Sequence, residues 1–247
     1  MTIQSASFFK ILDSVDSTNN YAMAMVREGM AKHGMAIVAK EQTAGKGQRG
    51  KSWQMRPGQS IAMSIILKTD KLRTDQQFYL NMLIALAAND FLKKYAGKET
   101  TIKWPNDLYW RDRKAGGILI ETVFKGTGWK WAVVGIGINV NQNRFHKSLP
   151  NPVSLQQITG KEYDVIVLAE ELHTAVMKRI EMIAVTAADK VKKEYTRHLY
   201  KMDTIVKLKK ASAVFKTTIK GVTEQGQLIT ADTMERHFDF GEVEWVI

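Results

Sequence analysis

A glycine-rich basic loop at residues 41–53, EQTAGKGQRGKSW, constrains the fold more than any other segment. Two nucleotide-binding patterns match it, the dinucleotide fingerprint G-x-G-x-x-G and the P-loop pattern G-x-x-x-x-G-K-S. Both require a helix directly after the loop, because the phosphate binds at the N-terminus of that helix. Pro57 and Gly58 would break such a helix, and residues 60–67 have the composition of a strand. We therefore expect neither a P-loop nor a dinucleotide-binding fold.

The same loop supports two simpler interpretations. Its glycines let the backbone approach a ligand closely, while Lys46, Arg49 and Lys51 supply positive charge for a phosphate or a carboxylate. Trp53 at its end could stack on a planar base. Alternatively, the segment is a solvated basic hairpin tip with Trp53 packed in the core. The loop alone does not decide between them.

The composition is that of an ordinary globular chain with an excess of positive charge. The chain has 247 residues, a formal net charge of +11 and no cysteine, which excludes a thiolate metal site and thioester chemistry. The N-terminal segment lacks the pattern of a signal peptide, and the longest apolar run, 82–88, is too short to cross a bilayer. We expect a cytoplasmic protein without a membrane partner. The charge indicates either an acidic partner or a solvated basic surface.

The distribution of apolar residues predicts mixed α and β structure followed by a small C-terminal unit. We expect strands at 8–12, 35–40, 60–67, 101–103, 108–110, 117–123 and 129–138, the last three antiparallel with a turn at 126–128. Helices are expected from about 16 to 28 and over 78–95, 165–188 and 190–200. Residues 139–157 form a polar connection long enough to be functional. From residue 203 onward, short alternating strands predict a β-barrel, so we expect one domain over 1–200 and a second over 201–247.

Two further segments carry residues suited to phosphate chemistry. In KWPND, residues 103–107, Pro105 favours an extended backbone before it and leaves Asp107 exposed in a turn. Asp107 could hold magnesium or serve the turn alone. Lys114 precedes two glycines and an apolar strand, a position suited to a phosphate or to developing negative charge. A solvated hairpin lysine is the alternative.

The segment GIGIN at 135–139 alternates glycine with isoleucine. Glycine in the interior of a strand often marks a place where another group approaches the backbone closely. We therefore expect a close neighbour against Gly135 and Gly137.

These segments occur together in one known family. DSTN at 16–19, the loop at 42–53, KWPND at 103–107, RKAGGILIE at 113–121 and GIGINVN at 135–141 resemble the motifs of the biotin protein ligases in order and spacing. Each motif alone is weak, but five in order are specific, and with the small C-terminal barrel the resemblance covers nearly the whole chain. The resemblance implies an α+β fold, with a mixed β-sheet backed by helices, as in class II synthetase cores, and a small C-terminal SH3-like β-barrel.

The resemblance also implies a two-step ligase reaction. Biotin and ATP with Mg²⁺ give biotinyl-5′-AMP and pyrophosphate, and a lysine of a biotin carboxyl carrier protein then takes the biotin. The substrates are thus biotin and ATP, without a tightly bound prosthetic group. The implied partner is an acidic carrier domain and not nucleic acid, and a homodimer is compatible with the family.

The resemblance assigns roles to individual positions. The expected biotin site comprises Ser17, Thr18, Gln42, Gly45, Lys46, Lys114 and Gly117, with Asn19 supporting the turn. The expected ATP site comprises Lys46, Gln48, Arg49, Trp53, Asn106, Lys114 and Asn139, and the expected metal ligand is Asp107. Lys114 is the main catalytic candidate, assisted by Lys46 and Arg49, because fixed cations suit the attack of one anion on another.

Three features modify this expectation. The common family loop reads G-R-G-R where this chain has Gly45-Lys46-Gly47-Gln48, so either Gln48 or Arg49 takes the role of the second arginine. Only fifteen residues precede Asp16, so we expect the type without an N-terminal DNA-binding domain. The glycine motif of the loop differs from that of the relatives that attach lipoate.

Two functions of other classes stay open on the sequence. A basic nucleic-acid-binding protein would show salt-dependent affinity for DNA or RNA, and the unclustered charge counts against it. A non-catalytic biotin-binding relative is the other. The presence of Lys114, Asp107 and Trp53 favours activity over mere binding.

Overall fold

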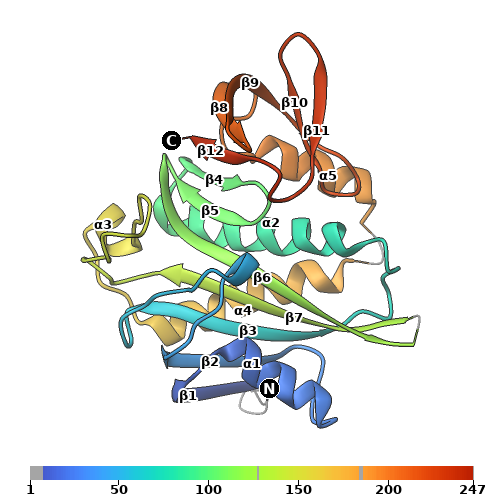
Figure 1. Ribbon diagram of the computed structural model, residues 1–247. Coiled ribbons are helices and arrows are strands. Elements are labelled where there is room, and N and C mark those ends of the chain that lie inside the picture. Colours follow the sequence, from blue (N-terminus) through green and yellow to red (C-terminus); the bar gives the residue numbers. More distant parts are fainter. Residues whose placement is uncertain (1–7, 127, 184–185, 247) are drawn as a thin grey trace.

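A seven-stranded mixed sheet lies at the centre of the molecule (Figure 1), in a computed structural model that describes residues 8–126, 128–183 and 186–246. The order in the sheet is β1-β2-β3-β7-β6-β5-β4. Only the β1–β2 pairing is parallel within this sheet. The strands are β1 (Phe9–Val15), β2 (Met35–Gln42), β3 (Ser60–Lys68), β4 (Thr100–Lys103), β5 (Asp107–Trp110), β6 (Arg113–Lys125) and β7 (Gly128–Asn139).

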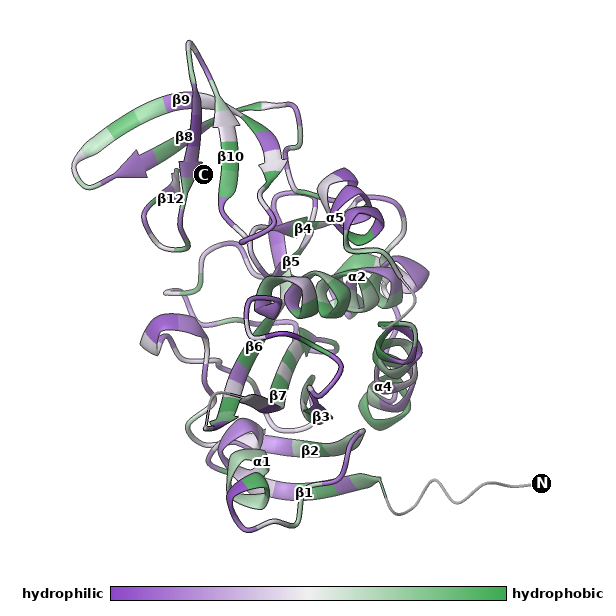
Figure 2. Cartoon of the chain, turned by 90° about the vertical axis from the view of Figure 1, so that its right-hand side faces the viewer, coloured by the Kyte–Doolittle hydropathy of each residue, from purple (hydrophilic) through white to green (hydrophobic). Residues whose placement is uncertain are grey.

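Two long helices bury one face of this sheet. The helices α2 (Gln77–Ala96) and α4 (Val165–Glu181) lie side by side on that face (Figure 2), and α5 (Ala188–Arg197) packs against α2. Most of α2 is apolar and rich in alanine and leucine, which favour helix, and it ends at Gly97 with a φ of 77°. The apolar side chains between these helices and the sheet form the main core.

The opposite face of the sheet is covered only in part. The short helix α1 (Thr18–Arg27) packs Ala22 and Met25 against Ile37, Ile66 and Val133 at one end of that face. Farther along the same face, small or polar residues replace the apolar ones. Residues opposite one another in an antiparallel ladder point to the same side, so Asp107, Gly117 and Gly137 form one row across β5, β6 and β7. We call this open part the site face.

The C-terminal residues form a second, antiparallel sheet of five strands, in the order β11-β10-β9-β8-β12. We call it the C-terminal sheet. It contacts the first sheet near β4, where the Trp104 indole Nε1 donates to the carbonyl of Gly226 at 2.9 Å. Its strands are β8 (Ile205–Lys210), β9 (Ala213–Val222), β10 (Leu228–Ala231), β11 (Glu235–Phe238) and β12 (Glu244–Val246).

The expected α+β class and most expected elements are confirmed. The strand β3 follows the glycine-rich loop, so the structure excludes the P-loop and the dinucleotide fold, as expected. Part of the expected turn at 126–128 lies outside the described residues.

Two expectations about the helices are wrong. The helix expected over 165–188 ends at Glu181, and residues 184–185 lie outside the described part. The Tyr79 hydroxyl lies within hydrogen-bonding distance of the carbonyls of Ile183 and Thr186, which holds the chain there in a connection between α4 and α5. The connection 139–157 contains an unexpected short helix, α3 (Leu155–Thr159), which begins with a capping box between Ser154 and Gln157.

Candidate active site

The glycine-rich loop is a tight hairpin and not a phosphate-binding turn before a helix. The Trp53 amide donates to the carbonyl of Gly45 at 2.8 Å, and the Gly47 amide donates to that of Lys51 at 2.6 Å. Arg49 and Gly50 turn the tip with φ values of 54° and 75°, a conformation that costs glycine little. The structure therefore presents a basic hairpin, and the position of Trp53 distinguishes the two simpler interpretations.

Two glycines of β7 receive side chains from other segments, as expected. A side chain on Gly137 would overlap the indole of Trp53, and one on Gly135 would overlap the amide of Asn19. Because both glycines point to the site face, Trp53 and Asn19 lie along one strand. The half-buried Trp53 rests on the bare backbone of β7, outside the main core.

A buried polar pocket lies where α1 begins. The Gln42 side-chain oxygen accepts from the Thr18 amide at 2.8 Å and from the Thr18 hydroxyl at 3.1 Å. The Ser64 hydroxyl lies 2.7 Å from the Thr18 hydroxyl and 2.6 Å from the Asn19 amide oxygen. Ser17 is the N-cap of α1 yet makes no capping hydrogen bond, so its buried hydroxyl is available to a ligand. The linked groups make a rigid cup of donors and acceptors.

The sequence interpretation did not include Ser64 among the site residues. Its signal was a hydroxyl in the middle of the apolar strand SIAMSIILK. A buried hydroxyl needs a hydrogen-bond partner, and Ser64 finds its partners on α1.

An irregularity between β5 and β6 determines where Lys114 points. Leu108 pairs with Gly116 and Tyr109 pairs with Lys114, so one extra residue, Ala115, stands in β6. By simple alternation Lys114 would share the core side with Gly116 and Ile118. The irregularity shifts this alternation and turns Lys114 to the site face beside Gly117. Such bulges often re-aim a side chain next to an active site.

Each of the two lysines expected in the site contacts a carboxylate. The Lys114 ammonium lies 2.6 Å from Asp107, with about a third of each side chain exposed. The Lys46 ammonium lies 3.9 Å from Glu121. Glu121 also accepts a 2.8 Å hydrogen bond from Asn19, which links Lys46 to the polar pocket. Glu121 was not among the expected site residues, although it ends the motif RKAGGILIE.

Lys103 lies at the end of the Asp107 row, under the C-terminal sheet. It pairs with Asp107 across β4 and β5, and its ammonium lies 3.1 Å from the Tyr109 hydroxyl. The same ammonium lies 4.8 Å from the ring centre of Tyr109 and 5.2 Å from that of Trp245. Burial lowers the pKa of Lys103 to about 8, although the nearby Asp107 opposes this shift. Burial likewise raises the pKa of Tyr109.

Four of the expected ATP-site residues have other contacts in the structure: two are buried and hydrogen-bonded to backbone carbonyls, and two lie at the tip of the hairpin. Asn106 is buried and donates to the carbonyl of Ile118. Asn139 is buried and donates to the carbonyl of Val153 at 3.1 Å. Gln48 and Arg49 lie at the hairpin tip, where Arg49 faces the C-terminal sheet. Their roles toward a ligand stay predictions.

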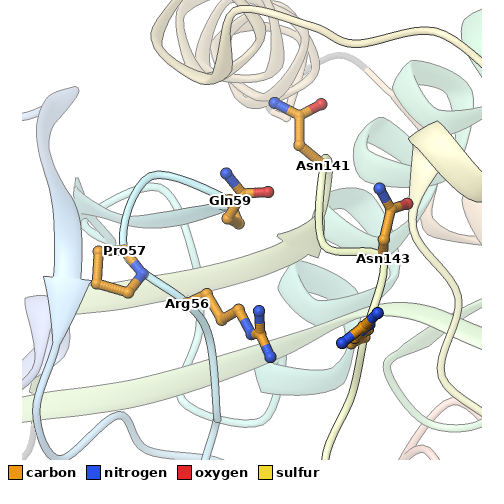
Figure 3. A pocket seen from close by; sticks show the side chains of 6 residues that line it. Arg56, Pro57, Gln59, Asn141 and Asn143 are labelled. Carbon is orange, nitrogen blue, oxygen red and sulfur yellow. The ribbon is translucent and has the colours of Figure 1, made fainter.

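A polar cavity of about 460 Å³ opens between the segment before β3 and the chain that follows β7. Arg56, Pro57, Gln59, Asn141, Asn143 and Arg144 line it. Figure 3 shows Arg56 reaching from the first segment toward the second. The Arg56 backbone amide donates to the Gln142 side chain at 3.0 Å, so the two walls are joined. The sequence interpretation gave these arginines no role.

The acidic side chains of the site suit a metal brought by a ligand better than a metal held by protein alone. Within residues 8–126, 128–183 and 186–246, no group of three His, Asp or Glu side chains is arranged to hold a metal ion. Asp107 offers one partly exposed carboxylate on the site face. Mg²⁺ commonly takes one or two carboxylates, with water and phosphate oxygens as its other ligands.

Among the described helices, none is long and apolar enough to cross a membrane.

Comparison with known proteins places this geometry in a family. Residues 11–140 match the model of the Biotin/lipoate A/B protein ligase family. The biotin–[acetyl-CoA-carboxylase] ligase of Paracoccus denitrificans is 33% identical over 162 residues, 62% of this chain and 65% of that protein. The bifunctional ligase/repressor BirA of Escherichia coli is 33% identical over 149 residues, 60% of this chain. The match spans only 46% of that relative's length.

Solved structures agree with the fold over almost the whole chain. The biotin protein ligase of Aquifex aeolicus, determined in complex with biotin and ATP, superposes with a TM-score of 0.80 at 23% identity, and the match covers 96% of this chain and 98% of that one. The biotin protein ligase of Leishmania major in complex with biotinyl-5-AMP superposes with a TM-score of 0.67 at 20% identity, covering 94% of this chain and 99% of that one. The central sheet and the C-terminal sheet therefore have the arrangement found in those structures.

Proposed function

The chain belongs to the biotin/lipoate A/B protein ligase family, and we propose that it activates biotin with ATP and transfers it to a lysine of a biotin carboxyl carrier protein. The observation that carries the proposal is the pairing of Lys114 with Asp107 and of Lys46 with Glu121 on the site face, beside the glycines of β6 and β7. Both ammonium groups contact carboxylates that a stronger anionic ligand can replace. Such a face suits a reaction between two anions.

The polar pocket is the proposed site of the biotin head group. A ureido ring offers both donors and a carbonyl acceptor, and the pocket supplies matching groups from Ser17, Thr18 and Gln42. Asn19 and Ser64 fix their orientation from behind. A pre-oriented set of buried polar groups rejects a ligand that lacks the matching groups, which favours biotin over lipoate.

Lys114 is the proposed catalytic residue of the first step. The biotin carboxylate attacks the α-phosphate of ATP, a new phosphorus–oxygen bond forms, and pyrophosphate leaves. Lys114 exchanges its contact with Asp107 for contacts to the carboxylate and the phosphate, so two like-charged groups can approach. Lys46 does the same from the hairpin once it leaves Glu121. Both cations then stabilise charge that increases in the transition state.

Trp53 and the polar cavity are the proposed site of the nucleotide. One side of the Trp53 indole rests on Gly137, which leaves the other side for the adenine ring. Arg56 and Arg144 in the cavity add positive charge beyond the end of β7. Asp107, released by Lys114, would supply a carboxylate to the Mg²⁺ that accompanies ATP.

The test is transfer of labelled biotin to a purified carrier domain. With ATP and Mg²⁺, the chain should label the carrier, and without the carrier it should accumulate biotinyl-AMP. Omission of ATP is the control, and lipoate in place of biotin tests substrate choice. Failure to form the adenylate, or preference for lipoate, would contradict the proposal.

A further inference from the structure

The Arg49 side chain, at the tip of the hairpin, contacts the turn between β11 and β12 of the C-terminal sheet. Arg49 and Gly50 form the turn of the hairpin, both with positive φ. The Arg49 guanidinium lies 5.4 Å from the ring centre of Phe240, in the turn between β11 and β12. Arginine over an aromatic face is a favourable arrangement.

Gly241, next to Phe240, leaves room for this guanidinium. A Cβ atom built on Gly241 would overlap Arg49 directly, so no side chain can stand there while Arg49 is in place. The φ of Gly241 is 86°, a value that also favours glycine. The turn is therefore shaped to receive the arginine.

Phe240 is itself fixed to the central sheet. Its ring meets that of Trp104 at 75° with centres 5.8 Å apart. Trp104 is buried and its indole nitrogen donates to Gly226, as described above. A chain of contacts thus joins the hairpin tip to the C-terminal sheet and returns to the KWPND segment.

We infer that Arg49 is a positioning residue that latches the hairpin onto the turn at 239–242. This inference rests on the proposed function, because the hairpin carries Lys46 and Trp53, the groups proposed to face the phosphate and the adenine. While Arg49 contacts the turn, the hairpin holds Lys46 and Trp53 over the site and slows the release of biotinyl-AMP. Gln48, one residue earlier, is less exposed and its side-chain oxygen has no hydrogen-bond partner among the described residues.

The test compares three single variants of the full chain, Arg49→Ala, Phe240→Leu and Gly241→Ala. Each should release preformed, labelled biotinyl-AMP about two- to fivefold faster, the range expected from loss of one exposed cation–π contact. Because one contact is removed in each case, the double variant Arg49→Ala/Phe240→Leu should release no faster than Arg49→Ala alone. The maximum rate of adenylation should change less than the release rate.

Two matched control variants distinguish loss of the latch from a general loss of stability. Phe124→Leu removes another exposed phenylalanine that packs on a tryptophan, and Gly126→Ala strains another glycine of positive φ with open space around it. Both should release biotinyl-AMP at the wild-type rate. If only Arg49→Ala speeds release, or if the two changes multiply, Arg49 acts on the ligand itself and the latch is wrong.

Hydrogen exchange tests the latch without catalysis. In the ligand-free chain, the peptide covering residues 44–55 should exchange faster in all three variants than in the wild type and the controls. Unchanged exchange in the three variants would overturn the latch. A wild-type chain that forms no biotinyl-AMP would instead contradict the proposed function, and the exchange result would still decide the latch.

Discussion

Lys114 owes its orientation to the extra residue in β6, so its position is unusually well fixed for a lysine. The backbone around it is also tied to the segment after β7, because its amide donates to the carbonyl of Asn151 at 2.7 Å. Fixing the backbone reduces the entropy that must be lost when the ammonium meets a ligand. This fixed position suits a catalytic cation better than a solvated hairpin lysine.

We expect Lys114→Ala to fold normally and to lose adenylation. The loss should be about a hundredfold or more in rate, roughly 3 kcal/mol, as for removal of one donor to a developing negative charge. Pre-steady-state formation of biotinyl-AMP measures it. Lys161→Ala, an exposed lysine with no assigned role, is the control. Near-normal adenylation by Lys114→Ala would contradict the role proposed for this residue.

Because of Lys103, we expect the free energy of unfolding to rise with pH above pH 8. Its pKa is about 8 in the folded chain and near the ordinary 10.5 when unfolded. Below pH 8 both states are protonated and the full cost of the buried charge is present. Between pH 8 and 10.5 the unfolded state binds more protons, so the free energy of unfolding rises with pH.

The matched variant is Lys103→Met, which keeps the length of the side chain and removes the charge. The difference between wild type and variant should change by roughly 3 kcal/mol over the whole window, and by about 2 kcal/mol up to pH 9.5, from 1.4 kcal/mol for each pKa unit. Denaturant unfolding at pH values from 7.5 to about 9.5, below the titration of ordinary tyrosines, checks it. Parallel pH dependence in the two proteins would show that Lys103 titrates normally.

At the scale of elements, residues of the proposed biotin and ATP sites lie against two glycines that are two residues apart in β7. Gly135 receives Asn19 and Gly137 receives Trp53. We expect Gly135→Ala to displace Asn19 and weaken biotin binding while ATP binding changes little. Gly137→Ala should displace Trp53 and weaken ATP binding, by up to about 1–3 kcal/mol if base stacking is lost.

Calorimetric titration of each ligand into each variant measures these effects. The two substitutions are controls for one another, since they add the same methyl group to the same strand. Equal losses for both ligands in both variants would mean that β7 is distorted as a whole.

The glycines and prolines made the elements predictable, because they act locally. Pro57 and Gly58 excluded a helix after the loop. The alternating glycines of β7 predicted that other groups approach the backbone of that strand closely. Which neighbours they are, and the extra residue beside Lys114, depend on pairing between strands far apart in sequence. The same holds for Ser64 and for the Arg49 contact with the C-terminal sheet. No local pattern predicts these contacts. The motifs therefore indicated most segments of the candidate site, but not Ser64, Glu121 or the contacts between the segments.

At the scale of the whole molecule, the excess positive charge reaches β8 and β9 of the C-terminal sheet. Exposed Lys207 and Lys216 stand directly opposite one another across β8 and β9. Like charges in that position destabilise a sheet. Nearby Lys209 stands opposite Glu244 of β12, so its charge is balanced within the sheet. We propose that the Lys207–Lys216 pair serves an acidic partner.

We expect rising ionic strength to slow transfer of biotin to the carrier more than it slows adenylation. Two macromolecules of opposite charge lose their electrostatic attraction as salt screens it, whereas the chemistry of small substrates inside the site is less exposed to salt. Single-turnover rates of the two steps at several salt concentrations measure this. Equal responses, or micromolar binding of duplex DNA at physiological salt, would contradict the idea.

The spacing of the two glycines in β7 also sets the distance between Asn19 and Trp53. Residues two apart on a strand are about 7 Å apart, and the docked positions of Asn19 and Trp53 differ by that one step. The separation between the two halves of the site is therefore set by the geometry of a central strand and not by a loop. In the proposed site, this strand spacing would set the distance over which the two substrates meet. A biotin analogue with a longer or shorter side chain should therefore bind its pocket and yet present its carboxylate out of reach of the phosphate.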